Sequence, residues 1–230
     1  MKFVSVALAA SILFAPLAQA ANTELQIANK ANGRPGIDLS IDYTVGTHVG
    51  YASSVTGRAL VDFESASVSS AEFRVSIASM TTGNTKRDCH MREALGLDYA
   101  LSGYPENHIC DANNNLPASG VDSVQYPEVI FELRGLNAAD GTPLTRIDAG
   151  AEVPVLALGS WTIHGVRKDQ VVSLKATRTQ DENGRNRLRV RGDFNLLLKD
   201  FGIEVMSWAG LIKVADRAKV KLDLDLNETR

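Results

Sequence analysis

Alternation of apolar and polar residues is the feature that most constrains how this chain folds. The clearest case lies near the C-terminus, where Val220, Leu222, Leu224 and Leu226 alternate with charged or polar neighbours. A side-chain period of two places the apolar residues on one face of a β-strand and leaves the other face to water. Strands of this kind must hide their apolar faces against one another, so the pattern favours a closed barrel or a sandwich.

The same pattern recurs along the chain and predicts an all-β fold of about eight antiparallel strands. The expected strands cover residues 37–45, 48–60, 73–77, 128–133, 153–164, 170–179, 188–196 and 219–226. The second of these is expected to break or bend at Gly50 and Gly57, and residues 61–70 should continue it as a strand or form a turn. The strand that ends near His164 and its successor should form a hairpin, with Arg167, Lys168 and Asp169 in a charged, exposed loop.

Residues 1–20 are expected to be a cleavable secretory signal peptide. Lys2 precedes an apolar run, and Ala18 and Ala20 form a small-x-small cleavage pattern. The run is too short, and too soon followed by polar residues, for a membrane span of about 20 residues. The alternative is an uncleaved anchor. We expect an exported protein that is not integral to a membrane, with residues 21–230 as one mature domain.

The charge pattern limits the possible binding partners, and the cysteine content predicts one disulfide. The net charge of -3 is interspersed and forms no basic stripe, which argues against nucleic acid as a partner. The only two cysteines, Cys89 and Cys110, would be exported to an oxidising compartment, so we expect a disulfide between them. A metal or redox pair is the alternative, but the spacing fits neither pattern.

One helix interrupts the strand pattern. Asn84 is a suitable N-cap for a helix over residues 85–95, and Gly96 follows as a stop signal. Residues 96–125 read as a long loop that carries Cys110. The predicted disulfide would therefore pin this loop to the helix.

The sequence contains no motif that identifies catalytic or metal chemistry. We find no nucleophile elbow, P-loop or dinucleotide fingerprint. His90 and Glu93 can share a helix face, but a metal site needs further ligands. His164 has no nucleophile beside it in sequence. We therefore predict no catalytic residues, no metal site and no enzymatic activity.

Four aromatic residues could serve either as core or as a ligand site. Phe73, Phe131, Trp161 and Phe194 alternate with polar neighbours on separate expected strands. Such residues ordinarily fill the core. In a barrel of about eight strands, however, the inward positions can also surround one ligand.

Several segments in fixed order resemble the YceI-like family, the lipocalin-like bacterial proteins associated with polyisoprenoid binding. The segments are VTGR at residues 55–58, TGNTKRDCHMRE at 82–93, YPEVIFE at 126–132, WTIHGV at 161–166 and DFGI at 200–203. The chain departs from the family at Leu198, where an arginine is usual, at His48, which is displaced by about one residue, and in the long insert after the helix.

The resemblance implies an eight-stranded antiparallel barrel with one inserted helix, and a periplasmic location. It also implies an apolar channel that binds a polyisoprenoid or quinone-type lipid, with no cofactor other than that lipid. Together with the aromatic positions above, it assigns inward, ligand-binding positions to Phe73, Val75, Ile77, Val129, Phe131, Trp161, Ile163, Phe194 and Phe201.

Two other functions stay open at this point. An enzyme could use His90, His164 or polar groups in the cavity, which would require convergent groups with perturbed ionisation. A domain without ligand would fill the barrel with the aromatic residues and use the long insert for docking. A homodimer is also left open. The barrel interior discriminates among these alternatives.

Overall fold

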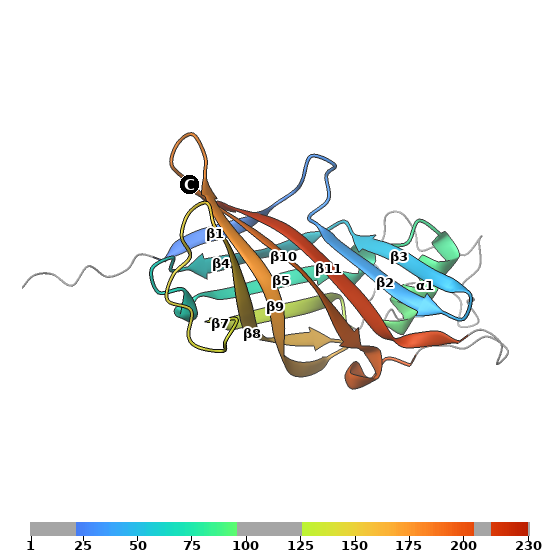
Figure 1. Cartoon of the computed structure of the whole chain (residues 1–230). Coiled ribbons are helices and arrows are strands. Elements are labelled where there is room, and N and C mark those ends of the chain that lie inside the picture. The colour runs from blue at the N-terminus through green and yellow to red at the C-terminus, as the bar shows by residue number, and fades with distance from the viewer. Residues whose placement is uncertain (1–21, 96–125, 205–212, 230) are drawn as a thin grey trace, which may run out of the picture.

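The computed structural model describes residues 22–95, 126–204 and 213–229, which form one antiparallel sheet and one α-helix (Figure 1). The strands are β1 Thr23–Ala28, β2 Ile37–Tyr43, β3 Gly46–Ala52, β4 Val55–Val61, β5 Ser70–Ser76, β6 Met80–Thr81, β7 Glu128–Ala138, β8 Glu152–Ile163, β9 Val166–Gln180, β10 Asn186–Leu197 and β11 Val214–Glu228. The helix is α1, Thr85–Ala94, and three 3₁₀ turns are η1 Ala66–Val68, η2 Ile77–Ser79 and η3 Leu198–Phe201. The prediction of an all-β fold with one helix is confirmed.

Eight strands close into a barrel in the order β1-β4-β5-β7-β8-β9-β10-β11, because β1 also pairs with β11. Leu25 on β1 lies opposite Ala59 on β4, and Ile27 lies opposite Leu226 on β11. The sequence pattern did not predict β1, because its residues are mostly polar. This short strand nevertheless supplies the pairing that closes the barrel.

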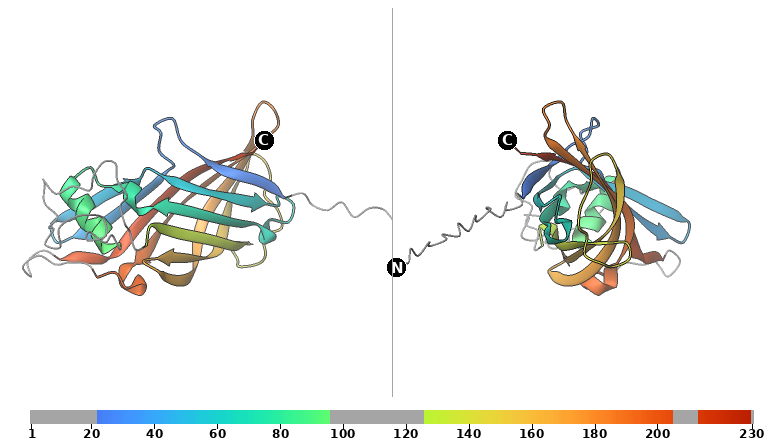
Figure 2. Two further views of the ribbon diagram at one scale, coloured as in Figure 1. Left: turned by 180° about the vertical axis from the view of Figure 1, so that it is seen from behind. Right: turned by 60° about the vertical axis from the view of Figure 1, so that its left-hand side comes forward.

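The remaining strands β2, β3 and β6 extend from β11 as a side sheet. Residues 225–228 of β11 pair with β1, whereas residues 214–222 pair with β2. Figures 1 and 2 show that the β2–β3 hairpin and α1 lie at the same end of the molecule. We call this the helix end.

The expected strand over residues 48–60 is in fact two strands, β3 and β4, with a break at Ser53 and Ser54. Gly57 within β4 has φ +136°, and a Cβ placed on it would lie 2.1 Å from the carbonyl oxygen of Glu72. Only glycine fits so close to the neighbouring strand at this backbone angle. Residues 61–70 form no additional strand, since the chain after β4 turns through η1 into β5.

The β8–β9 hairpin is tighter than predicted, and the charged run is not its loop. His164 and Gly165 both have positive φ, 51° and 73°, and make a two-residue turn. The charged residues lie in β9, where Arg167 and Asp169 are on the outer face of the barrel and Lys168 lies opposite the inward Trp161. Arg167 forms an ion pair with Glu132 on β7. Asp169 forms one with Arg134, also on β7, at 2.9 Å.

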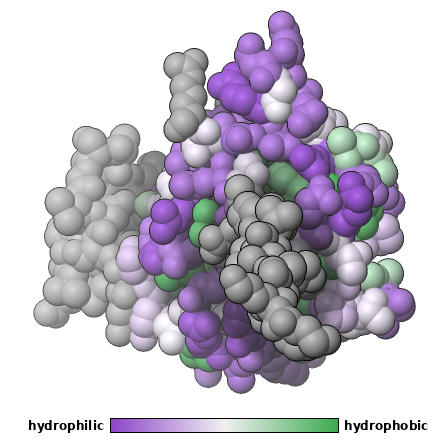
Figure 3. Space-filling model, turned by 90° about the vertical axis from the view of Figure 1, so that its left-hand side faces the viewer, coloured by the Kyte–Doolittle hydropathy of each residue, from purple (hydrophilic) through white to green (hydrophobic). Residues whose placement is uncertain are grey.

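Two loops close the barrel at the end opposite the helix, which we call the loop end. They connect β4 to β5 and β7 to β8. Ser67 N donates to Leu144 O at 2.7 Å, and Ile147 N donates to Phe63 O at 3.0 Å. Phe63, Leu144 and Ile147 are all buried. Seen from this end, hydrophilic side chains make up most of the visible surface, with hydrophobic ones deeper between them (Figure 3).

Local hydrogen bonds place α1 as the sequence predicts. Asn84 Oδ1 accepts from Arg87 N at 3.0 Å, which confirms the N-cap. Asp88 is buried and accepts from Thr81 Oγ1, Thr82 N and Thr82 Oγ1, each at 2.6 Å. These bonds tie the first turn of the helix to the end of β6.

The ladder between β9 and β10 covers only part of the two strands. Residues 175–180 pair with residues 186–191. Between residues 166–174 and 192–197 the structure gives no strand pairing, and Gln170 Nε2 donates to Asn195 O at 3.3 Å. We call this stretch the β9–β10 seam. It lies toward the helix end of the barrel.

Candidate functional site

The predicted ligand-binding residues all belong to the barrel's apolar cluster. Val75, Ile77, Val129, Trp161, Ile163, Phe194 and Phe201 are buried, and Phe73 and Phe131 are half-buried and pack against them. Their inward placement agrees with the alternation pattern. Their role in binding a ligand stays a prediction.

Strand register aligns three aromatic side chains in one row across the barrel wall, and a ring contact adds Phe194 to it. Phe73 on β5 lies opposite Phe131 on β7, which lies opposite Trp161 on β8. The ring centroids of Phe131 and Trp161 are 4.6 Å apart, and those of Trp161 and Phe194 on β10 are 5.4 Å apart. We call these four residues the aromatic row. Trp161 is its centre.

Close backbone approach at a glycine makes room for this row. A Cβ on Gly159 would lie 2.7 Å from two ring carbons of Phe131 and 2.5 Å from Glu132 O. Any larger residue would push the Phe131 ring away from Trp161. Gly159 therefore sets the spacing between β7 and β8 at the aromatic row.

The Trp161 indole carries a donor that is not used. Its side chain is 8 % exposed, and Nε1 is buried without a hydrogen-bond partner. Buried indole N–H groups usually find an acceptor. Periodicity could not have signalled this, because a missing acceptor depends on what the other strands place nearby.

Phe201 and Ile77 lie at the helix end of the interior. Phe201 ends η3 at 3 % exposure, and its carbonyl oxygen lies 3.3 Å from His164 Nδ1. The His164 ring also packs edge-on against Tyr126, with centroids 4.8 Å apart. This histidine therefore joins the β8–β9 turn to η3 and to the start of the YPEVIFE segment.

In the described part of the chain, Lys168 is the charged residue opposite Trp161 in the strand register, and it makes no ion pair or hydrogen bond with the described residues. The carboxyl and guanidinium groups with shifted pKa values lie on the outer surface. His48 stacks on Tyr43 at 4.1 Å in the side sheet, where burial and the nearby Arg87 charge lower its pKa. Within residues 22–95, 126–204 and 213–229, no three His, Cys, Asp or Glu side chains are grouped to hold a metal.

A polar depression lies on the outer face of β1, β4 and β5. It is lined by Gln26, Gly57, Arg58, Glu72 and Arg74. Hydrogen bonds to Glu128 and Glu72 raise the pKa of Arg74, so its charge is already paired. This depression is separate from the apolar interior.

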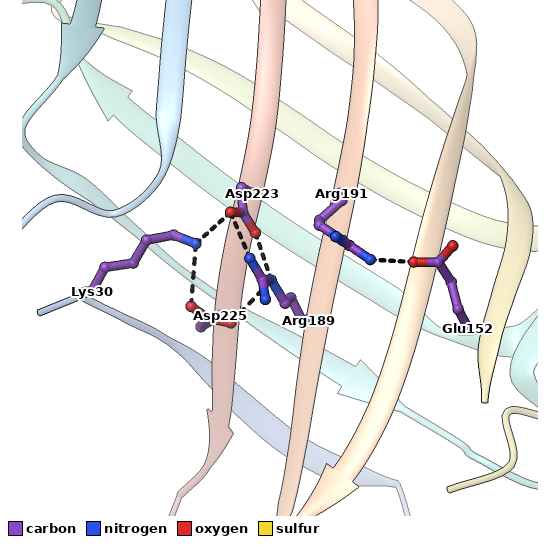
Figure 4. Close-up of polar contacts among 6 residues, drawn as sticks. All are labelled: Lys30, Glu152, Arg189, Arg191, Asp223 and Asp225. Atoms are coloured by element: carbon purple, nitrogen blue, oxygen red, sulfur yellow. Dashed lines mark hydrogen bonds and ion pairs between the residues drawn. The ribbon is translucent and has the colours of Figure 1, made fainter. Parts of the chain in front are cut away.

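A network of ion pairs covers the outer face of β8, β10 and β11 (Figure 4). Asp223 accepts two hydrogen bonds from Arg189, at 2.7 and 2.8 Å, and pairs with Lys30 at 2.8 Å. The Arg189 hydrogen bond is the main reason why the pKa of Asp223 lies well below its usual value. Arg191 on β10 pairs with Glu152 on β8.

Parts of the predicted site lie outside the described residues. These are the signal segment 1–20, the insert 96–125 and, with it, Cys110. Cys89 on α1 is 1 % exposed and is not a free thiol. The Cys89–Cys110 bridge stays a prediction. Among the described residues, no helix is long and apolar enough to cross a membrane.

Comparison with solved structures finds the same fold in several bacterial proteins. A polyisoprenoid binding domain from Saccharophagus degradans, implicated in plant cell wall breakdown, covers 90 % of this chain and 99 % of its own, at 12 % identity and TM-score 0.60. Burkholderia cenocepacia BcnA covers 83 % and 94 %, at 15 % identity and TM-score 0.53. The Campylobacter jejuni YCEI protein covers 79 % and 85 %, at 19 % identity and TM-score 0.53.

No curated protein sequence matches the chain significantly. The comparison with protein families matches residues 29–226 to the YceI-like domain. This match spans β2 to β11 and contains the whole aromatic row. The chain therefore belongs to the YceI-like domain family.

Proposed function

We propose that this protein binds a long apolar isoprenoid lipid, a polyisoprenoid or a quinone-type amphiphile, inside the barrel, and that it carries or sequesters this lipid in the periplasm without catalysis. The observation that carries the proposal is the closed eight-stranded wall with an apolar inner face and the aromatic row at its middle. Family membership and the polyisoprenoid binding domain among the structural neighbours support it.

Burial of apolar surface would supply the affinity. A hydrocarbon chain gains roughly 25 cal/mol for each Å² of apolar surface removed from water. Many charges on the outer surface are paired, whereas the inner face presents mainly aliphatic and aromatic side chains. We expect the lipid to enter from the helix end, because the buried loops close the loop end.

The binding test uses protein exported and purified without detergent. Native mass spectrometry should reveal a bound isoprenoid lipid, and added long-chain prenyl quinone should raise the melting temperature. The proposal fails if the protein carries no lipid and neither prenyl quinones nor polyprenols change its melting temperature or tryptophan fluorescence.

A substitution that fills the interior separates a ligand cavity from a packed core. Ala157 on β8 is 1 % exposed and faces the interior opposite Val172. If the barrel holds a ligand, Ala157→Phe should reduce quinone affinity about tenfold or more while the free energy of unfolding changes little. If side chains fill the barrel, overpacking should instead cost about 1–3 kcal/mol of stability. Ser173→Phe, on the exposed face of β9, is the matched control and should change neither.

Periplasmic location and the disulfide belong to the same proposal. Cleavage after Ala20 would leave a mature chain beginning at Ala21, which intact-mass measurement of the exported protein checks. Thiol labelling under non-reducing conditions tests the bridge between Cys89 and Cys110. Retained Met1 on a membrane-bound form, or two free thiols, would contradict the respective expectation.

A further inference from the structure

Among the described residues, Trp161 carries a buried donor without a partner on the inward face of β8, where the ligand is proposed to bind. Trp161 lies on the inward face of β8, between Ala157 and Ile163, which are also buried. Its Nε1 is fully enclosed and makes no hydrogen bond. An enclosed donor without a partner costs free energy, because folding has removed it from water without replacing the bond.

The rings that flank the indole cannot supply that bond, and Lys168, which lies opposite Trp161 on β9, carries only donors. Phe131 and Phe194 flank the indole, with their rings tilted by 42° and 34° to it, and neither has a hydrogen-bond acceptor. A contact between an N–H group and an aromatic face is much weaker than a bond to oxygen. Ser160, the preceding residue, lies on the opposite face of β8, so its hydroxyl is not available to Trp161.

We propose that Trp161 Nε1 donates a hydrogen bond to a carbonyl, ether or hydroxyl oxygen of the lipid, and so makes this barrel selective for oxygen-bearing amphiphiles over hydrocarbons of equal length. The inference rests on the proposed lipid-binding function and names the ligand chemistry within it. The half-buried Phe131 ring moves aside to admit the oxygen. Selectivity then arises from the donor, whereas overall affinity arises from the apolar tail.

The test compares two probes of similar carbon number, squalene and a prenyl quinone, on two proteins. We expect the ratio of quinone affinity to squalene affinity to be about tenfold higher in wild-type protein than in the variant Trp161→Phe, which lacks the donor. Trp161→Phe keeps an aromatic ring but removes the donor together with the five-membered ring of the indole. The variant should lose most of this preference, because quinone binding weakens more than squalene binding. Phe131→Leu, which removes a ring but no donor, is the control and should weaken both probes alike.

A spectroscopic readout keeps the test independent of the variant's folding. The chain has two tryptophans, Trp161 and Trp208, so indole ¹H–¹⁵N spectra give two signals. The Trp161 signal should move downfield with the quinone and not with squalene. Equal binding of both probes by wild-type protein, an unmoved Trp161 signal or a preference kept by Trp161→Phe would overturn the inference. If neither probe binds, the proposed function itself fails, and the inference fails with it.

Discussion

Single residues anchor the helix end through hydrogen bonds that are local in sequence. The Asp88 carboxylate accepts three hydrogen bonds from Thr81 and Thr82, and it is only 9 % exposed. This carboxylate lies in the helix but fixes residues that precede it. The TGNTKRD segment is therefore a structural motif whose members contact one another.

Replacing Asp88 should destabilise the protein. Asp88→Ala leaves the Thr82 N–H and two hydroxyls without their acceptor, so we expect a loss of about 1–3 kcal/mol in the free energy of unfolding. Urea denaturation measures this loss. Lys86→Ala, at an exposed position of the same helix, is the control and should stay close to wild type. A stability equal to that of the control would show that these bonds contribute little.

At the scale of elements, the strands of the barrel are unequally joined. The ladder between β8 and β9 runs along twelve register pairs, whereas β9 and β10 share six at one end only. In the β9–β10 seam, backbone groups that point from one strand toward the other lack ladder partners. Val171 and Leu197 on the outer face of this stretch are among the exposed large hydrophobic residues.

The seam should therefore exchange amide hydrogens faster than the rest of the wall. We expect rapid exchange for those amides of residues 166–174 that do not point toward β8, and slow exchange for residues 175–180. Hydrogen exchange followed by NMR resolves the two sets on the same strand. Uniform protection along β9 would mean that a ladder not present in the structure forms in solution. A bound lipid should slow exchange in the seam if it packs against Phe194.

At the scale of the whole molecule, charged pairs on the outside join strands whose register the apolar interior sets. Lys30, which follows β1, bridges to Asp223 and Asp225 on β11. Lys175 on β9 and Arg191 on β10 both reach Glu152 on β8. Because a one-residue slip would reverse inside and outside, these pairs support the register that the hydrophobic pattern sets.

Acid should weaken this network. The pKa values of Asp223, Glu152 and Asp181 are lowered in the folded state, so their contribution to stability is present above the unfolded values near 4 and is lost as the pH falls below them. His48, whose pKa is also lowered, adds a loss in the same direction below about pH 6.5. We expect the free energy of unfolding to be level above pH 7, to fall slightly toward pH 5 and to fall steeply below pH 4.

Asp223→Asn isolates the largest of these contributions. At pH 7 the variant should be less stable than wild type, and the difference should shrink as the pH is lowered below 4. There the unfolded wild-type chain gains a proton on this carboxyl, which the folded chain, with its lowered pKa, takes up only at still lower pH. Asp193→Asn is the control, since no ion pair joins Asp193 to the described residues. A difference that is constant with pH would assign the effect to packing instead.

The sequence predicted most strands and the helix because their signals are local. Apolar alternation located β2, β8, β10 and β11, and Asn84 located the start of α1. The alternation pattern missed β1, because Thr23, Glu24 and Gln26 make this strand look like a polar segment. It also placed the charged residues of β9 in a loop. In both places the outcome depends on partner strands that lie far away in the chain.

The candidate site, too, could be predicted from the sequence only in part. Which residues face inward follows from a period of two, so the aromatic row could be predicted residue by residue. The sequence by itself thus determined the strand pattern, the inward face and the family. Only the tertiary structure decided that β1 closes the barrel, that β9 and β10 part along a seam, and that the Trp161 donor is left without an acceptor. These features are set by which strands become neighbours and in what register, and such contacts between distant segments leave no periodic signal in any one of them.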